Sequence, residues 1–157
     1  MYRKFFVLVL AALLVLPGTG RAKDILETAT DAGTFTILLA AVKAAGLAPL
    51  MQGKGPMTLF APTDDAFAKL PKATMESLLR PENKEKLRQL ITFHLVMGRI
   101  TSHDFMGKRL EAATVEGGFL LIDATKGIMI DDAKMIKADL IADNGFIHVI
   151  DTVLMPH

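Results

Sequence analysis

The sequence predicts an α+β fold in which helices gather in the N-terminal half and strands in the C-terminal half. Up to about Met106, apolar residues recur mainly at helical spacing. From Lys108 onward, the pattern changes to short apolar runs separated by turns that contain glycine. Helices gathered early and strands gathered late favour an α+β fold.

The first 22 residues have the layout of a secretory signal peptide. Arg3 and Lys4 give a positive start, Phe5 to Leu16 form an unbroken run of 12 apolar residues, and small residues lead to Ala22. A helix that spans a bilayer needs about 20 apolar residues, so this run is short for a membrane anchor. We therefore expect residues 1–22 to be removed on export. Residues 23–157 then form a single secreted or periplasmic domain with no integral membrane segment.

The charge balance argues against a nucleic-acid partner. The chain has 18 Lys and Arg against 17 Asp and Glu, and loss of a leader with three basic residues and no acid leaves a net charge of −2. A mildly acidic domain has no general attraction to nucleic acid or to anionic lipid. The chain has no cysteine, so an exported form cannot rely on disulfides and must be stabilised by burial.

The clearest predicted helix is Thr34 to Ala45. It places Phe35, Leu38, Leu39 and Val42 on one face, and Gly46 follows as a left-handed stop. The remaining helices are expected at Asp24 to Ala29, after Thr74 as an N-cap with Met75, Leu78 and Leu79 facing inward, at Glu82 to Thr92, and at His103 to Met106 with Ser102 as the N-cap.

The strands are predicted by apolar runs that flank turn residues. Asn144 and Gly145 separate the last two runs, and this dipeptide favours the positive φ values of a tight hairpin turn. Phe146 to Ile150 is apolar on both faces, which indicates a central strand covered on both sides. The other strands are expected at Thr58 to Ala61, Ala113 to Glu116, Phe119 to Asp123, Ile128 to Ile130 and Met135 to Ala142.

The residues needed for catalysis or metal binding are not assembled in the sequence. Ser102, His103 and Asp104 are the residue types of a catalytic triad, but adjacent residues point apart on regular elements. The four histidines include no pair at the i, i+4 spacing of a helical zinc site. Gly53-Lys54-Gly55 lacks the flanking residues of a phosphate-binding loop. We therefore expect no enzyme activity, no metal site and no cofactor.

Three segments together resemble the fasciclin (FAS1) domain family. They are Thr58 to Phe67, Leu90 to Gly98, and Asn144 to Pro156, and they resemble the first block, the Tyr-His region and the second block of that family. The resemblance implies a wedge of two β-sheets with helices packed alongside. It also implies adhesion or contact with the extracellular matrix as the usual role.

Two positions depart from the family pattern. Phe93 stands where the family has the tyrosine of its Tyr-His pair, so the phenol hydroxyl is missing. Vertebrate members carry an integrin-binding Asp-Ile-Leu or Asp-Ile-Met before the second block, and this sequence has Asp139, Leu140 and Ile141 there. The aspartate is kept, but the two residues that follow also fit the core of a strand.

The motif residues have a local structural interpretation. Pro62 ends a strand, Thr63 caps the next helix, Asp64 lies in its first turn and Phe67 faces inward. We expect the two motif histidines to be buried and hydrogen-bonded. The candidate interaction residues implied by the resemblance are Thr58, Phe60, Pro62, Thr63, Asp64, Phe67, Phe93, His94, Asp139, Leu140, Asn144, Gly145, His148 and Asp151.

The leading functional hypothesis is an exported, non-catalytic module that contacts a protein or polysaccharide at the cell surface. The alternative is a carrier of an apolar small molecule such as a carotenoid or lipid, because flexible methionines adapt to irregular ligands. The methionines expected to line such a groove are Met51, Met57, Met97, Met106, Met129 and Met135.

Overall fold

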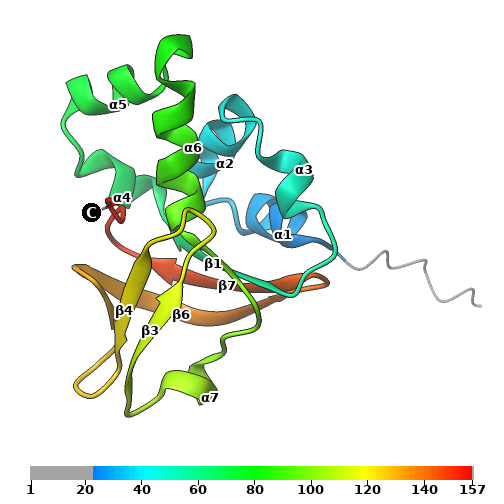
Figure 1. The fold of residues 1–157 in the computed structure, drawn as a ribbon, viewed down its shortest axis with the longest axis vertical. Helices are drawn as coiled ribbons and strands as arrows, with labels where there is room; N and C mark the ends of the chain where they lie inside the picture. The colour runs from blue at the N-terminus through cyan, green and yellow to red at the C-terminus, as the bar shows by residue number, and fades with distance from the viewer. Residues whose placement is uncertain (1–22, 157) are drawn as a thin grey trace, which may run out of the picture.

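The computed structural model describes residues 23–156, so the predicted signal peptide lies outside the described residues. All the described helices but the last lie on one side of a curled β-sheet (Figure 1). No helix of the described part is both long and apolar enough to cross a bilayer. The helices are α1 (Ile25–Ala32), α2 (Thr36–Ala44), α3 (Ala48–Met51), α4 (Asp64–Ala68), α5 (Lys72–Leu78), the 3₁₀ turn η1 (Pro81–Asn83), α6 (Lys84–Phe93) and α7 (Ser102–Phe105). The strands are β1 (Met57–Pro62), β2 (Leu95–Met97), β3 (Arg109–Ala113), β4 (Phe119–Asp123), β5 (Met129–Ile130), β6 (Ala133–Ala142) and β7 (Gly145–Ile150).

The first two helices begin and end on the predicted residues or close to them. Asp24 and Glu27 form a capping box at the start of α1, and Gly33 ends that helix with φ 75°. Helix α2 lies within the predicted range, and Gly46 follows it with φ 70°. The apolar stripe of α2 packs into the main core.

Two predicted caps are wrong. Helix α5 begins at Lys72, because the Pro71 carbonyl accepts from the N–H groups of Thr74 and Met75, and Thr74 therefore lies inside the first turn. Leu79, expected to face inward, is 47% exposed. Helix α7 is capped by Thr101 in a capping box with Asp104, so Ser102 is its first residue and not its cap.

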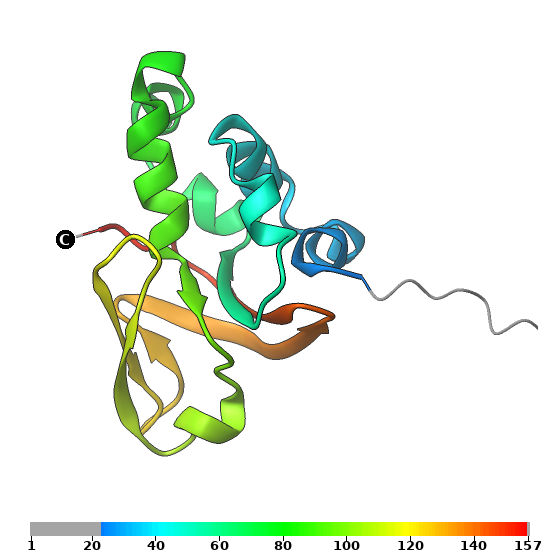
Figure 2. The same ribbon diagram turned by 45° about the vertical axis from the view of Figure 1, so that its right-hand side comes forward.

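The strands follow one hydrogen-bonded order, β2-β1-β7-β6-β5-β4-β3. Only β1 and β7 are parallel neighbours. All six residues of β7 are buried, which confirms the predicted central strand. The long strand β6 has two register shifts. It pairs with β7 on one side and with β5 on the other, and so connects β2, β1 and β7 to β5, β4 and β3. A bridge between Val96 and Thr114 brings the two ends of the order together, and Figure 2 shows β3 and β4 running steeply across β6 and β7.

The first hairpin differs from its prediction. Strand β3 spans Arg109–Ala113, so it shares only Ala113 with the predicted strand Ala113 to Glu116, and Thr114 to Glu116 join the two predicted turn glycines in a longer turn. The backbone N–H of Thr114 donates to the carbonyl of Gly118 over 2.8 Å, and the Glu116 carboxylate accepts from the Gly118 N–H over 2.9 Å. The Glu116 side chain thus closes a wider turn than the two-glycine turn that was predicted.

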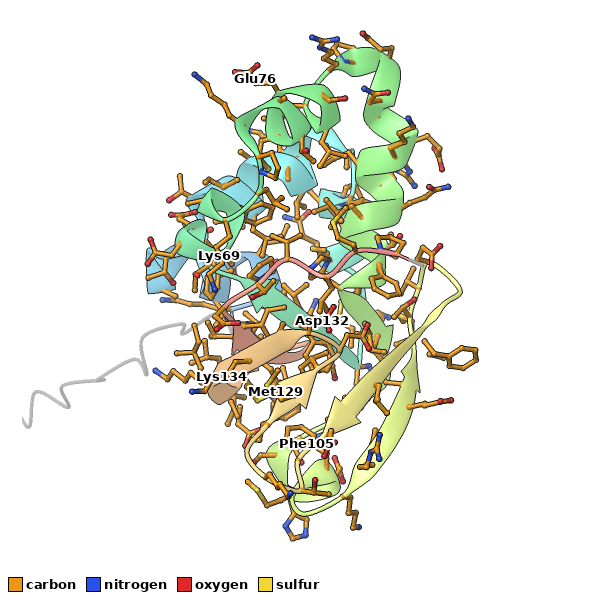
Figure 3. The ribbon with its side chains drawn as sticks, turned by 90° about the vertical axis from the view of Figure 1, so that its left-hand side faces the viewer. Lys69, Glu76, Phe105, Met129, Asp132 and Lys134 are labelled. Carbon is orange, nitrogen blue, oxygen red and sulfur yellow. The ribbon has the colours of Figure 1, made fainter. Side chains whose placement is uncertain are left out.

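Two apolar cores lie on opposite faces of the sheet. The first lies between the helices and one face, and includes Leu38, Leu59 and Ile147. The second lies within the fold of the sheet and includes Phe60, Phe105 and Ile150. Figure 3 shows Phe105 of α7 in the β-rich half, and Lys69 and Glu76 in the helical half. Of the two motif histidines, His94 follows α6 directly before β2, and His148 lies in β7.

Candidate interaction site

The first motif block holds helices and loops together through its polar side chains. Thr63 accepts from the Ala66 N–H over 3.2 Å, as predicted for an N-cap. Asp64 does more than favour its own helix, because its Oδ1 accepts from the Ile37 N–H over 2.8 Å and so satisfies a donor in the first turn of α2. The Thr58 hydroxyl donates to the Gly98 carbonyl over 2.8 Å. These three side chains are therefore committed to the fold.

Asn144 links the β6–β7 turn to two segments that are distant in sequence. Its Nδ2 donates to the carbonyls of Met51 and Gly53 over 2.7 and 2.9 Å, and its Oδ1 accepts from the Ile25 N–H over 3.0 Å. The amide thereby fixes the start of α1 and the loop after α3 against the turn. Only an amide offers both donors and an acceptor in this way.

Gly145 is required for close approach and not for its φ. A Cβ at this position would lie 1.9 Å from the Met57 carbonyl oxygen of the neighbouring strand, which is a severe clash. The expectation of positive φ at Asn144 and Gly145 is wrong, because neither is among the residues with positive φ. The sequence dipeptide is explained by hydrogen bonding and packing.

His94 is fully buried and hydrogen-bonded to backbone at both ring nitrogens. Its Nδ1 lies 2.7 Å from the Leu90 carbonyl and therefore donates, while Nε2 accepts from the Leu154 N–H over 2.9 Å. Burial lowers the pKa of His94 to about 4. The imidazole is therefore neutral and joins α6 to the C-terminal segment.

His148 is also fully buried, but a carboxylate lies beside it. Its Nε2 donates to the Ile100 carbonyl over 2.7 Å, and its Nδ1 accepts from the Asp139 N–H over 3.1 Å. Asp139 Oδ1 lies 3.8 Å from the same Nδ1. Burial lowers the pKa of His148, and the bond to Ile100 and the charge of Asp139 oppose this shift.

Asp139 holds a backbone conformation that few side chains accept. Its φ is 60°, at the second register shift of β6. Its carboxylate accepts from the Ser102 N–H over 2.9 Å and from the Ser102 hydroxyl. Burial alone would raise the pKa of Asp139, but these bonds outweigh it and lower that pKa. Asp139 therefore ties the start of α7 to β6.

A family profile described as "Fasciclin domain" matches residues 33–156. The chain belongs to the fasciclin domain family. It is 44% identical over 147 residues to Protein sll1483 of Synechocystis sp., covering 93% of this chain and 81% of that protein. It is 35% identical over 125 residues to transforming growth factor-beta-induced protein ig-h3 of Sus scrofa, covering 78% of this chain and 18% of that protein. Cell surface glycolipoprotein MPB83 of Mycobacterium bovis is 30% identical over 148 residues, covering 89% of this chain and 65% of that protein.

A solved pair of FAS1 domains from the insect cell adhesion molecule Fasciclin I has the same fold. The TM-score is 0.58 at 20% identity, and the match covers 79% of this chain and 46% of that chain. At this identity the likeness concerns the fold alone. It confirms the predicted α+β fold with helices in the N-terminal half.

In this fasciclin domain, none of the fourteen motif residues is exposed. Phe60, Pro62, Phe67 and Phe93 are buried, so Phe93 packs in the second core where the family has tyrosine. Asp151 is half-buried, and its Oδ1 accepts from the Lys134 N–H over 2.8 Å. The motifs of this fasciclin domain therefore mark residues that hold the fold together, and several of them are also partly accessible.

The exposed apolar side chains are the feature that the motifs did not reveal. Leu140 is half-buried on the first core, but Ile141 is 74% exposed, although the strand pattern also fitted a core residue. The register shift between Lys137 and Leu140 breaks the simple alternation on which that interpretation depends. Other large apolar side chains that are exposed are Leu50, Leu79, Met97, Met106, Phe119, Met129, Ile136 and Met155.

The six methionines expected to line one groove do not gather. Met51 and Met57 lie in the first core and Met135 in the second. Met97, Met106 and Met129 are exposed. The composition alone could not distinguish a ligand groove from methionines distributed over two cores and the surface.

A surface pocket of about 630 Å³ lies at the β6–β7 turn beside Ile141. It is bounded by the start of α1, the loop 52–56, Arg99 and residues 141–146. Figure 1 shows the loop after α3 running alongside this turn. Among residues 23–156, no group of three or more His, Cys, Asp or Glu side chains could hold a metal ion.

Proposed function

We propose that the protein is an exported fasciclin domain that acts by contact with a partner at the cell surface and not by catalysis. The observation that carries this proposal is that the motif side chains are buried or half-buried and bond to other parts of the fold. Both motif histidines have both ring nitrogens bonded to backbone, and they are fully buried. The hydrogen-bonding capacity of both rings is therefore used within the fold.

The outer surface supports the same proposal. Ile136, Ile141 and Phe119 are large apolar side chains that stand 59%, 74% and 58% exposed on the sheet. Exposed apolar patches with a polar rim are typical of contact surfaces. Relatives described as a cell surface glycolipoprotein and a cell adhesion molecule are in keeping with this role.

A binding experiment with intact cells tests the proposal. Labelled protein should bind saturably to the surface of cells from its own source that lack the gene, and deletion of the gene should reduce attachment. The double variant Ile136→Ser, Ile141→Ser should weaken this binding, because it removes exposed apolar contacts without opening a core. Leu79→Ser, on the helical half, is the matched control. Non-saturable binding together with unchanged attachment of the deletion strain would contradict the proposal.

A further inference from the structure

We propose that the pocket at the β6–β7 turn binds an acidic sugar unit of a surface polysaccharide. This inference rests on the proposed contact function and names the ligand class of one site. The pocket combines two cationic side chains, unbonded backbone donors, carboxylates and an apolar wall formed by Ile141. A sugar acid has a carboxylate, hydroxyl groups and an apolar ring face, and each of these finds a counterpart there.

Arg99 is positioned to bind a carboxylate. Its guanidinium carbon lies 4.8 Å from the centroid of the Phe146 ring, in a cation–π contact that orients the planar group. Arg99 is exposed, and no hydrogen bond or ion pair within residues 23–156 uses its donors. An oriented guanidinium with unused N–H groups is suited to a bidentate bond with a carboxylate, and its orientation lowers the entropy lost on binding.

The loop across the pocket supplies further donors. Lys54 is exposed and has no ion pair within the described chain. The backbone N–H groups of Lys54 and Gly55 donate to no acceptor among residues 23–156. Gln52 adds an exposed amide that can both donate and accept. These groups match sugar hydroxyls, which also both donate and accept.

The acids of the pocket decide between a sugar acid and a simple anion. Asp24, Glu27 and Asp143 line the same pocket, so three carboxylates accompany the two cations. Inorganic phosphate concentrates up to two negative charges on one centre and has few O–H donors, so these carboxylates disfavour it more than a sugar unit with one carboxylate and several hydroxyls. The hydroxyls of a sugar would donate to them, while its single carboxylate reaches Arg99. The exposed face of Ile141 can then pack against the carbon-bound hydrogens of the ring.

The test uses defined oligosaccharides with the purified protein. An oligogalacturonate should bind in titration calorimetry, and a neutral galactan oligomer of the same length should bind at least about tenfold more weakly, because charge-assisted hydrogen bonds are lost. Arg99→Gln should weaken oligogalacturonate binding by about tenfold or more, and Arg99→Lys should lie between, since lysine keeps the charge but not the planar fork. Arg80→Gln, an exposed arginine between α5 and η1, should bind like the unaltered protein.

Three results would overturn this proposal. They are equal binding of the neutral oligomer, unchanged binding by Arg99→Gln, and tighter binding of inorganic phosphate or of an acidic peptide than of the oligogalacturonate. Because Arg99 is exposed, Arg99→Gln should keep its thermal midpoint, and chemical shift changes confined to Gly53, Gly55 and Ile141 would locate the ligand independently. If intact cells bind the protein saturably and Arg99→Gln binds them equally well, the contact function stands and the sugar site is wrong.

Discussion

The two buried histidines lie in different electrostatic surroundings although their hydrogen bonds are alike. Each ring donates to one backbone carbonyl and accepts from one backbone N–H. Beside His94 no charged side chain contributes to its pKa, and burial alone keeps the ring neutral. Beside His148, the Asp139 carboxylate lies 3.8 Å away and favours the charged ring. His94 therefore connects α6 to the C-terminal segment with no charged group beside it. His148 connects β6 to Ile100, and the partly exposed carboxylate of Asp139 lies beside it.

The largest effect on stability is expected from removal of the His94 side chain. His94→Ala should lower the free energy of unfolding by about 4 kcal/mol, because it creates a cavity and leaves the buried Leu154 N–H without an acceptor. Urea unfolding at neutral pH measures this loss. His103→Ala, at an exposed histidine of α7, should change stability by less than about 0.5 kcal/mol. An equal loss in both variants would remove the distinction between a buried link and an exposed ring.

Acidification should reduce the stabilisation that His94 provides, without a mutation. The pKa of His94 is about 4 in the fold, below its ordinary value of 6.5, so the unfolded chain binds more protons between these values. The stabilisation is therefore fully present above about pH 6.5 and is lost as the pH falls towards 4, by up to about 3 kcal/mol.

The variant His94→Gln isolates this effect, because its amide can donate and accept but does not titrate in this range. Urea unfolding from pH 7 to pH 4 should show a smaller decline for His94→Gln than for the unaltered protein. Parallel pH curves would assign the acid sensitivity to other groups. His148 should contribute less to the decline, because Asp139 opposes the shift that burial causes.

The smallest effect on stability is expected from substitutions of Asp139. Asp139→Ala should cost about 2 kcal/mol, because it removes the bonds to Ser102 and places alanine at φ 60°. Asp139→Gly should cost about 1 kcal/mol less, since glycine accepts this φ without strain. Thermal or urea unfolding of the two variants gives the difference. If alanine and glycine are equally tolerated, backbone strain at this position has no measurable part in stability.

Local patterns were sufficient where a residue acts on its own segment. The stripe of α2, the Thr63 cap, the double-sided burial of β7 and the burial of both histidines all follow from spacing and neighbouring residues. The likeness of the three motif segments to fasciclin domains added the arrangement of the elements. Spacing could not give this arrangement, because it does not say which strands pair.

The contacts that spacing could not give lie where a distant partner decides, whereas the caps of α5 and α7 and the turn at Glu116 were missed on local contacts. Asp64 caps α2, which comes much earlier in the chain, and Asn144 bonds to the start of α1 and to the loop after α3. No local pattern identifies such partners. The exposure of Ile141 depends on the register shift at Asp139. The Arg99 pocket brings together four segments that only the tertiary structure places side by side.

The parallel pairing of β1 with β7 has a consequence for the order of folding. Strand β1 lies between β2 and β7, and β7 follows every other described strand in the chain. Until Gly145 to Ile150 have left the ribosome, β1 lacks one of its two neighbours and both apolar cores are incomplete. A nascent chain of this topology therefore cannot complete either core before β7 has been synthesised, because the pairing of β1 with β7 is non-local.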